Sequence, residues 1–116
     1  MDDQHDQHLH ILWTDINPIT AEKMVFMYGF NALQQGWWEN VTIIIWGATV
    51  NFAAEDTGIQ EQIKKLIASG VAFSACKACA DQLGATEKLE QLGIEVIYWG
   101  RRLTNLLKSA SPLLTI

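Results

Sequence analysis

The chain has 116 residues, which is enough for one folded domain and too few for two hydrophobic cores. Apolar residues make up 49% of the chain, charged residues 18%, and prolines number only two, so a disordered or collagen-like chain is excluded. A net charge of −5 provides no general electrostatic attraction to nucleic acid or to an anionic membrane surface, and we expect neither as a partner.

The N-terminal residues 1–8 are polar and predict a flexible leader, followed by a single domain over residues 9–116. No basic stretch precedes an apolar segment there, so a secretory signal is not expected. The longest apolar stretch, Val41 to Ala54, contains three polar residues and is too short to span a bilayer. We therefore expect a soluble cytoplasmic protein.

Short apolar runs alternate with segments of helical period, which is typical of a parallel sheet covered by helices. The five predicted strands are mostly unbroken, as expected when both faces of a sheet are buried. They are His8 to Thr14, Val41 to Trp46, Val71 to Ala75, Ile94 to Trp99 and Leu113 to Ile116.

Four helical segments are predicted between these strands. Apolar residues recur at intervals of three and four in two stripes, Ala21-Met24-Val25-Tyr28-Ala32 and Ile59-Ile63-Leu66-Ile67. The third segment, Lys77 to Leu92, is expected to break at Gly84 into two short helices, and the fourth carries Leu103, Leu106 and Leu107 before Pro112. With right-handed crossovers, this order predicts an α/β fold, a three-layer α/β/α sandwich around a five-stranded, mainly parallel sheet.

Several helix ends carry recognisable signals. Thr57 and Gln60 have the spacing of a capping box, and Thr86 is placed to cap the second half of the third segment. Gly70 and Gly93 stand where a left-handed residue would end a helix before the next strand. The segment Gly47 to Val50 is interpreted as a turn.

In a parallel sheet the residues that follow each strand gather at one edge, where open α/β folds usually bind ligands. Trp13, Trp46 and Trp99 end three of the predicted strands. They are either core residues or an aromatic rim around a binding site. Arg101 and Arg102 follow the fourth strand and are candidates for attracting an anionic substrate, since residues 64–116 carry a net charge of +3.

Cys76 stands where the third strand ends and the next helix begins. The unpaired amides and dipole of that helix end, together with the neighbouring Lys77, predict a lowered thiol pKa and a reactive thiolate. Cys79 lies three residues further on, on the same helical face, and is placed to attack an oxidised or sulfur-bearing Cys76. Alternatively, both cysteines pack as small apolar residues beside Ala75, Ala78 and Ala80.

No metal or cofactor site is predicted. A zinc site at the cysteines would need two further ligands, for which the chain offers only His5, His8 and His10. The chain contains neither a glycine-rich phosphate loop nor a recognisable Ser-His-acid arrangement.

Three strings at these positions resemble the DsrE/DsrF-like family, and the resemblance extends over residues 9–116. They are GVAFSACKACA at 70–80, WWENVTIIIWG at 37–47 and GIEV at 93–96. Members of that family are small α/β/α proteins, commonly trimers or hexamers, and the characterised ones hand on sulfur as a cysteine persulfide. The resemblance implies that Cys76 bears the sulfur; Cys79 has no counterpart in many of those sulfur carriers.

Three functions follow as hypotheses. The first is a sulfurtransferase-like carrier that accepts sulfane sulfur on Cys76 and works with donor or acceptor proteins. The second is a non-catalytic module that assembles as a homo-oligomer, for which Trp37 and Trp38 are candidate contact residues. The third is a dithiol redox switch between Cys76 and Cys79.

Overall fold

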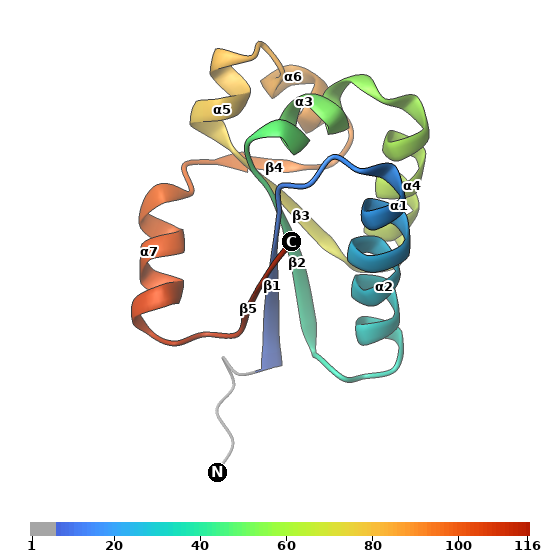
Figure 1. Ribbon diagram of the computed structural model, residues 1–116, viewed down its shortest axis with the longest axis vertical. Helices are drawn as coiled ribbons and strands as arrows, with labels where there is room; N and C mark the ends of the chain where they lie inside the picture. The colour runs from blue at the N-terminus through green and yellow to red at the C-terminus, as the bar shows by residue number, and fades with distance from the viewer. Residues whose placement is uncertain (1–6) are drawn as a thin grey trace.

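The computed structural model describes residues 7–116, which form one five-stranded sheet with helices on both sides (Figure 1). The strands are β1 (His8–Trp13), β2 (Asn40–Ile45), β3 (Ala72–Cys76), β4 (Glu95–Ile97) and β5 (Leu113–Thr115). The helices are α1 (Pro18–Thr20), the π-helical segment η2 (Ala21–Phe26), α2 (Met27–Gln34), α3 (Ala48–Glu55), α4 (Thr57–Ala68), α5 (Lys77–Gln82), α6 (Thr86–Gln91) and α7 (Gly100–Lys108). The predicted α/β/α class is confirmed.

All strand pairs are parallel, and the strand order is β4-β3-β2-β1-β5. The chain steps in one direction from β1 to β4 and then returns past the whole sheet to β5. Because parallel crossovers are right-handed, the reversal places α7 on the face opposite to the helices that connect β1 to β4. Figure 1 shows α7 across the strands from α1, α2 and α4. The two faces are therefore covered very unequally.

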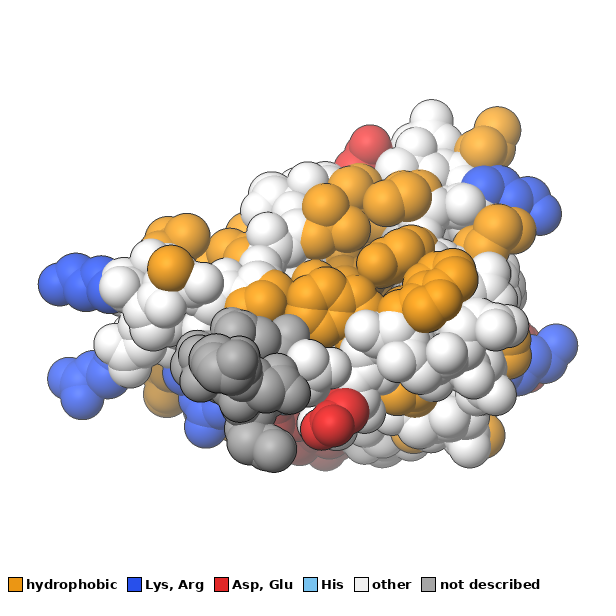
Figure 2. Space-filling model, turned by 90° about the horizontal axis from the view of Figure 1, so that it is seen from below, with side chains coloured by type: hydrophobic (Ala, Val, Ile, Leu, Met, Phe, Trp, Pro, Cys, Tyr) orange, Lys and Arg blue, Asp and Glu red, His pale blue; other side chains and the backbone are white. Residues whose placement is uncertain are grey.

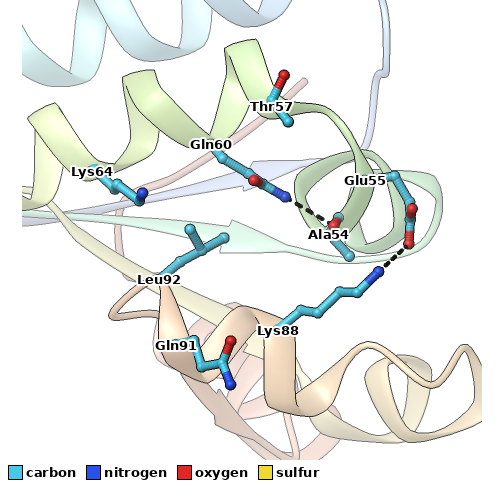
Figure 3. Close-up of a pocket in the computed structure, with 8 residues that line it drawn as sticks. All are labelled: Ala54, Glu55, Thr57, Gln60, Lys64, Lys88, Gln91 and Leu92. Atoms are coloured by element: carbon cyan, nitrogen blue, oxygen red, sulfur yellow. Dashed lines mark hydrogen bonds and ion pairs between the residues drawn. The ribbon is translucent and has the colours of Figure 1, made fainter.

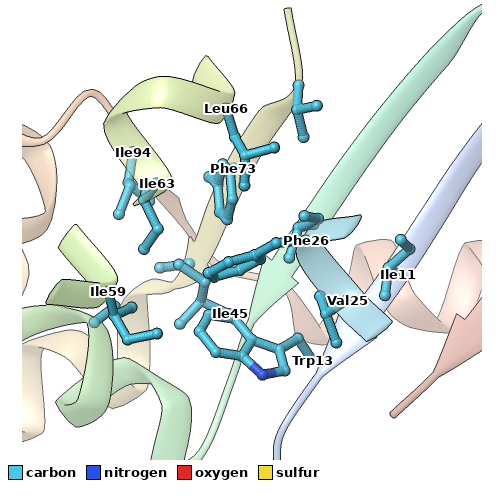
Figure 4. Close-up of a cluster of buried hydrophobic side chains, with 14 of the residues drawn as sticks. Ile11, Trp13, Val25, Phe26, Ile45, Ile59, Ile63, Leu66, Phe73 and Ile94 are labelled. Atoms are coloured by element: carbon cyan, nitrogen blue, oxygen red, sulfur yellow. The ribbon is translucent and has the colours of Figure 1, made fainter. Parts of the chain in front are cut away.

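The main core lies under α1 through α6. It combines alternate residues of the central strands, such as Ile11, Trp13 and Ile45, with the inward stripes of the helices (Figure 4). The π-helical segment contributes Phe26, whose ring meets Trp13 edge-on at 5.1 Å between centroids. Dense aromatic and aliphatic packing of this kind supplies most of the stability of a small domain.

The opposite face has a smaller cluster. Ile44, Cys76 and Trp99 are buried there, and Leu106 of α7 packs against them. None of the α7 residues is itself fully buried. Cys76 thus belongs to a thin layer held in place by one short helix.

The strand ends differ slightly from the prediction, and β4 differs most. It stops at Ile97 instead of Trp99, because its single neighbour β3 ends at the paired residue Cys76. Without a partner, Tyr98 turns outward and Trp99 turns inward. The end of β4 therefore depends on pairing more than on the apolar sequence.

Two predicted helix signals are confirmed, and three other expectations are wrong. Gly70 and Gly93 adopt positive φ angles of 109° and 92° at the ends of α4 and α6. However, Asp56, rather than Thr57, caps α4 by accepting a hydrogen bond from the amide of Ile59.

The other two corrections concern short helices. The hydroxyl of Thr86 donates to Asp81 instead of capping α6. The segment from Gly47 is not a simple turn, because Gly47 at φ 69° leads directly into the eight-residue helix α3. Val50, Ala53 and Ala54 form its buried side, a three- and four-residue spacing that marks a helix.

Candidate functional site

The carboxyl ends of β3 and β4 form the point at which the strand connections diverge. The chain leaves β3 towards α5 on one face and leaves β4 towards α7 on the other. Open α/β sheets bind ligands in the crevice that such a divergence creates. Cys76 at the end of β3 and Trp99 after β4 both lie at this point.

The Cys76 side chain is only 4% exposed. It lies on the α7 face beneath Trp99, together with Ile44. Burial raises the pKa of the Cys76 thiol, because an apolar environment disfavours the charged thiolate. The expected lowered pKa is therefore wrong, and the reason is tertiary: α7 folds over the cysteine.

The start of α5 nevertheless supplies the predicted amides. The backbone amides of Ala78 and Cys79 lie close enough to favour the Cys76 thiolate and partly oppose the rise in its pKa, although the side chain accepts no capping hydrogen bond from them. Cys79 packs against the cluster that contains Cys76, and its thiol raises the pKa of Cys76 further. The sulfur thus lies near the first amides of α5 on one side and has apolar neighbours on the other.

Lys77 does not act on the Cys76 thiol. Its ammonium group lies 3.2 Å from the carboxylate of Asp81 and 5.9 Å from the centre of the Tyr98 ring. The pKa of Lys77 is raised and that of Asp81 is lowered, Asp81 chiefly through its hydrogen bond from Thr86. This pair is a solvated ion pair along α5, which contributes little stability.

A chain of hydrogen bonds holds Trp99 over the cysteine. The Trp99 indole Nε1 donates to the Ser74 hydroxyl at 2.8 Å, and that hydroxyl donates to the carboxylate of Glu95 at 2.8 Å. Ser74 and Trp99 are both buried. Sequence reasoning did not select Ser74; its place two residues before Cys76, on the same face of β3, was the available signal.

The structure does not bring the three candidate tryptophans to one rim. Trp13 is fully buried in the main core, and its Nε1 donates to the Asp15 carbonyl at 2.8 Å. Trp99 is buried on the opposite face, and the half-buried Trp46 packs beside it. For Trp13 and Trp99, the core interpretation is the one that the structure supports.

The two arginines of α7 are both exposed. The Arg102 guanidinium lies 5.8 Å from the centre of the Trp99 ring, close enough for a cation–π contact. Arg102 therefore contacts Trp99, which packs over Cys76, but the structure shows no contact of Arg102 with the sulfur. The structure gives Arg101 no comparable contact with the site.

His8 and His10 share the α7 face of β1, with their rings stacked 4.1 Å apart. His8 Nε2 is hydrogen-bonded to the Thr42 hydroxyl at 2.8 Å. Within residues 7–116, no group of three or more His, Cys, Asp or Glu side chains is arranged to hold a metal ion. His5 and most of the predicted leader lie outside the described residues.

We expect His10 to make the protein less stable in mild acid. Burial, with smaller contributions from His8 and Arg102, lowers the pKa of His10 to about 4. The unfolded chain binds a proton near the ordinary pKa of 6.5, so stability falls as the pH drops from 6.5 towards 4 and is unaffected above 6.5. The urea midpoint of unfolding should decrease less from pH 7 to pH 5 in His10→Gln than in the unmodified protein. An equal decrease in the two proteins would contradict this prediction.

Two surface hollows flank α3. One, of about 500 Å³, lies between α3 and α5 and is lined by Gly47, Ala48, Asn51, Cys79, Gln82 and Leu83. The other, of about 490 Å³, lies between α3, α4 and α6, and the 2.9 Å ion pair of Lys88 with Glu55 crosses it (Figure 3). Only the first hollow contains a cysteine.

These features define an α/β/α protein with a pair of thiols at the carboxyl edge of a parallel sheet. The chain belongs to the DsrE/DsrF-like family, whose sequence model matches residues 17–115. It is also similar to the solved structure of a conserved protein of unknown function, BT1422, from Bacteroides thetaiotaomicron. The two chains are 37% identical and superpose with a TM-score of 0.95 over 100% of each.

No curated protein matches the chain significantly. No helix of the described residues is both long enough and apolar enough to cross a membrane.

Proposed function

We propose that the protein carries sulfane sulfur as a persulfide on Cys76. The DsrE-like family to which the chain belongs is associated with sulfur relay. The observation that supports this proposal most strongly is the place of Cys76 at the divergence of the sheet, where the amides of Ala78 and Cys79 at the start of α5 favour its anion. Amides in that arrangement stabilise the anion of a persulfide as they do other anions.

The burial of Cys76 favours storage over rapid exchange. Reactivity of a thiol depends on its thiolate fraction and on access, and both are low beneath Trp99. A persulfide held there is protected from dissolved oxidants and from free thiols in solution. We expect a donor persulfide to supply the sulfur and an acceptor thiol on another protein to remove it.

The experiment uses the position of Lys77 between the two cysteines. Trypsin cleaves after Lys77, so Cys76 falls in the peptide 66–77 and Cys79 in the peptide 78–88. After equilibration with a small-molecule persulfide and removal of the donor, mass spectrometry should find one added sulfur on peptide 66–77. An acceptor thiol should remove it, and Cys76→Ser should retain none at that position; a peptide 66–77 that never gains sulfur would overturn the proposal.

A dithiol–disulfide switch is the second candidate, because Cys79 packs against the cluster that contains Cys76. Its product would be a disulfide that links peptides 66–77 and 78–88 after mild oxidation. A reduction potential well below that of the cytosolic glutathione pool would favour this switch over sulfur carriage.

We also propose that the chain assembles as a homo-oligomer, a trimer or hexamer as the family resemblance implies. Trp37 is 57% exposed and lies beside Tyr28 in the turn before β2. Hydrophobic side chains gather on the end of the molecule seen in Figure 2, and such patches often mark contacts with other subunits. Sedimentation as a monomer at micromolar concentration would overturn this expectation.

A further inference from the structure

The two cysteines differ in their access to solvent. Cys76 is buried beneath Trp99, whereas Cys79 is half-buried and lines the hollow between α3 and α5. The hollow, of about 500 Å³, is large enough for a small thiol compound or for a cysteine side chain of an extended peptide. A donor that approaches from solvent therefore meets Cys79 first.

We propose that Cys79 is the receiving thiol, which takes sulfur from a donor persulfide in the α3–α5 hollow and passes it inward to Cys76. This inference rests on the proposed function and adds the route by which sulfur arrives. It assigns Cys79 a catalytic role in the acceptance of sulfur, ahead of storage on Cys76.

Both steps balance without an external oxidant or reductant. In the first, the Cys79 thiolate attacks the outer sulfur of a donor R–S–SH; a bond forms to Cys79, the donor S–S bond breaks, and R–S⁻ leaves. In the second, Cys76 attacks the outer sulfur of the Cys79 persulfide, and Cys79 leaves with the bond electrons. The proton of Cys76 passes to the Cys79 sulfur, because Cys79 packs against the cluster that contains Cys76.

The lining of the hollow indicates the class of donor. Its residues are Gly47, Ala48, Asn51, Gln82 and Leu83 besides the cysteine, and none of these carries a charge. The exposed amides of Asn51 and Gln82 can bond to a peptide backbone. The geometry fits a cysteinyl persulfide, which reacts in its protonated R–S–SH form, better than a permanent dianion such as thiosulfate, because the dianion would leave water without gaining an opposite charge.

A pulse experiment follows the sulfur through the two tryptic peptides. The probe is the persulfide of N-acetylcysteine amide, in which the persulfide is the only ionisable group, and the persulfide of N-acetylcysteine tests the effect of one added carboxylate. In the unmodified protein, sulfur should appear first on peptide 78–88 and later on peptide 66–77. Loading by the amide probe, which lacks the carboxylate, should be the faster.

Variants separate the route from the function. Cys76→Ser should still gain sulfur on Cys79, whereas Cys79→Ser should load Cys76 at least about tenfold more slowly, because a buried thiol reacts only through local opening. Ala48→Phe, which fills the rim of the hollow, should slow loading, whereas Ala68→Phe at an exposed position of α4 should not. Circular dichroism confirms that each variant folds.

The outcomes are distinct. If the unmodified protein loads and Cys79→Ser loads at the same rate, the route through Cys79 is overturned and the proposed function stands. If sulfur reaches peptide 66–77 before peptide 78–88, the route is overturned as well. If no sulfur reaches either peptide of the unmodified protein, both the function and the route fail.

Discussion

Replacement of Trp13 by alanine is expected to lower the free energy of unfolding by about 3–5 kcal/mol, the usual cost of deleting a fully buried large aromatic side chain. The Trp13 side chain has no exposed surface and meets Phe26 and Phe52 edge-on, with centroids 5.1 and 6.2 Å away. Its truncation opens a cavity between β1 and the helices that cover it. Because a domain is stable by only about 5–15 kcal/mol in total, this one change removes a large share.

Urea denaturation measures the loss, and Tyr98→Ala is the control. Tyr98 is 64% exposed, so truncation of that aromatic side chain should change the free energy of unfolding by only about 0.5 kcal/mol. Equal losses in the two variants would contradict the placement of Trp13 in the core. If the Trp13→Ala variant is stable but loads sulfur poorly, Trp13 contributes to the candidate site instead of to the core.

The second large effect is expected at Ser74. Ser74→Ala removes the acceptor of the Trp99 indole and leaves a buried N–H group without a partner, at a cost of about 1–3 kcal/mol. Since Trp99 covers Cys76, its release should also expose the sulfur. We expect the variant to be less stable and its Cys76 more reactive.

Two measurements test this prediction in a Cys79→Ser background, where Cys76 is the remaining thiol. Urea denaturation gives the stability, and the rate of reaction with a chromogenic disulfide gives the access to Cys76. Ser109→Ala is the control, because the Ser109 hydroxyl is exposed and bonds only near the end of α7. A loss of stability without faster reaction would mean that the Trp99 bond supports the fold but does not shield the sulfur.

The fold was largely predictable because its signals are local. The β-branched run of β2 buries Ile43, Ile44 and Ile45 in succession, and unbroken apolar sequence is the mark of a strand covered on both faces. Gly70 and Gly93 end their helices in a conformation that other residues rarely adopt. α3 was missed because its short buried stripe continues directly from β2, so the sequence from Val41 to Ala54 reads as one apolar stretch.

The candidate site was predictable in position but not in environment. The place of Cys76 at a strand end, and of the amides that follow it, is set by the local change from strand to helix. Successive side chains of β3 point to opposite faces of the sheet, so the strand register decides which face Cys76 joins. The position of α7 decides what covers that face. The pKa of the Cys76 thiol is raised by burial, and burial cannot be predicted from the residues next to it in the sequence.

The sequence by itself determined the alternation of strands and helices, the two thiols three residues apart and the family to which they belong. Only the tertiary structure decided that the two thiols have unequal access to solvent and that Trp13 and Trp99 lie on opposite faces of the sheet. The physical reason is that periodicity and turn chemistry act between residues close in the chain. Burial and ionisation instead depend on contacts such as that of Ser74 with Trp99, which the reversal of the chain after β4 brings together.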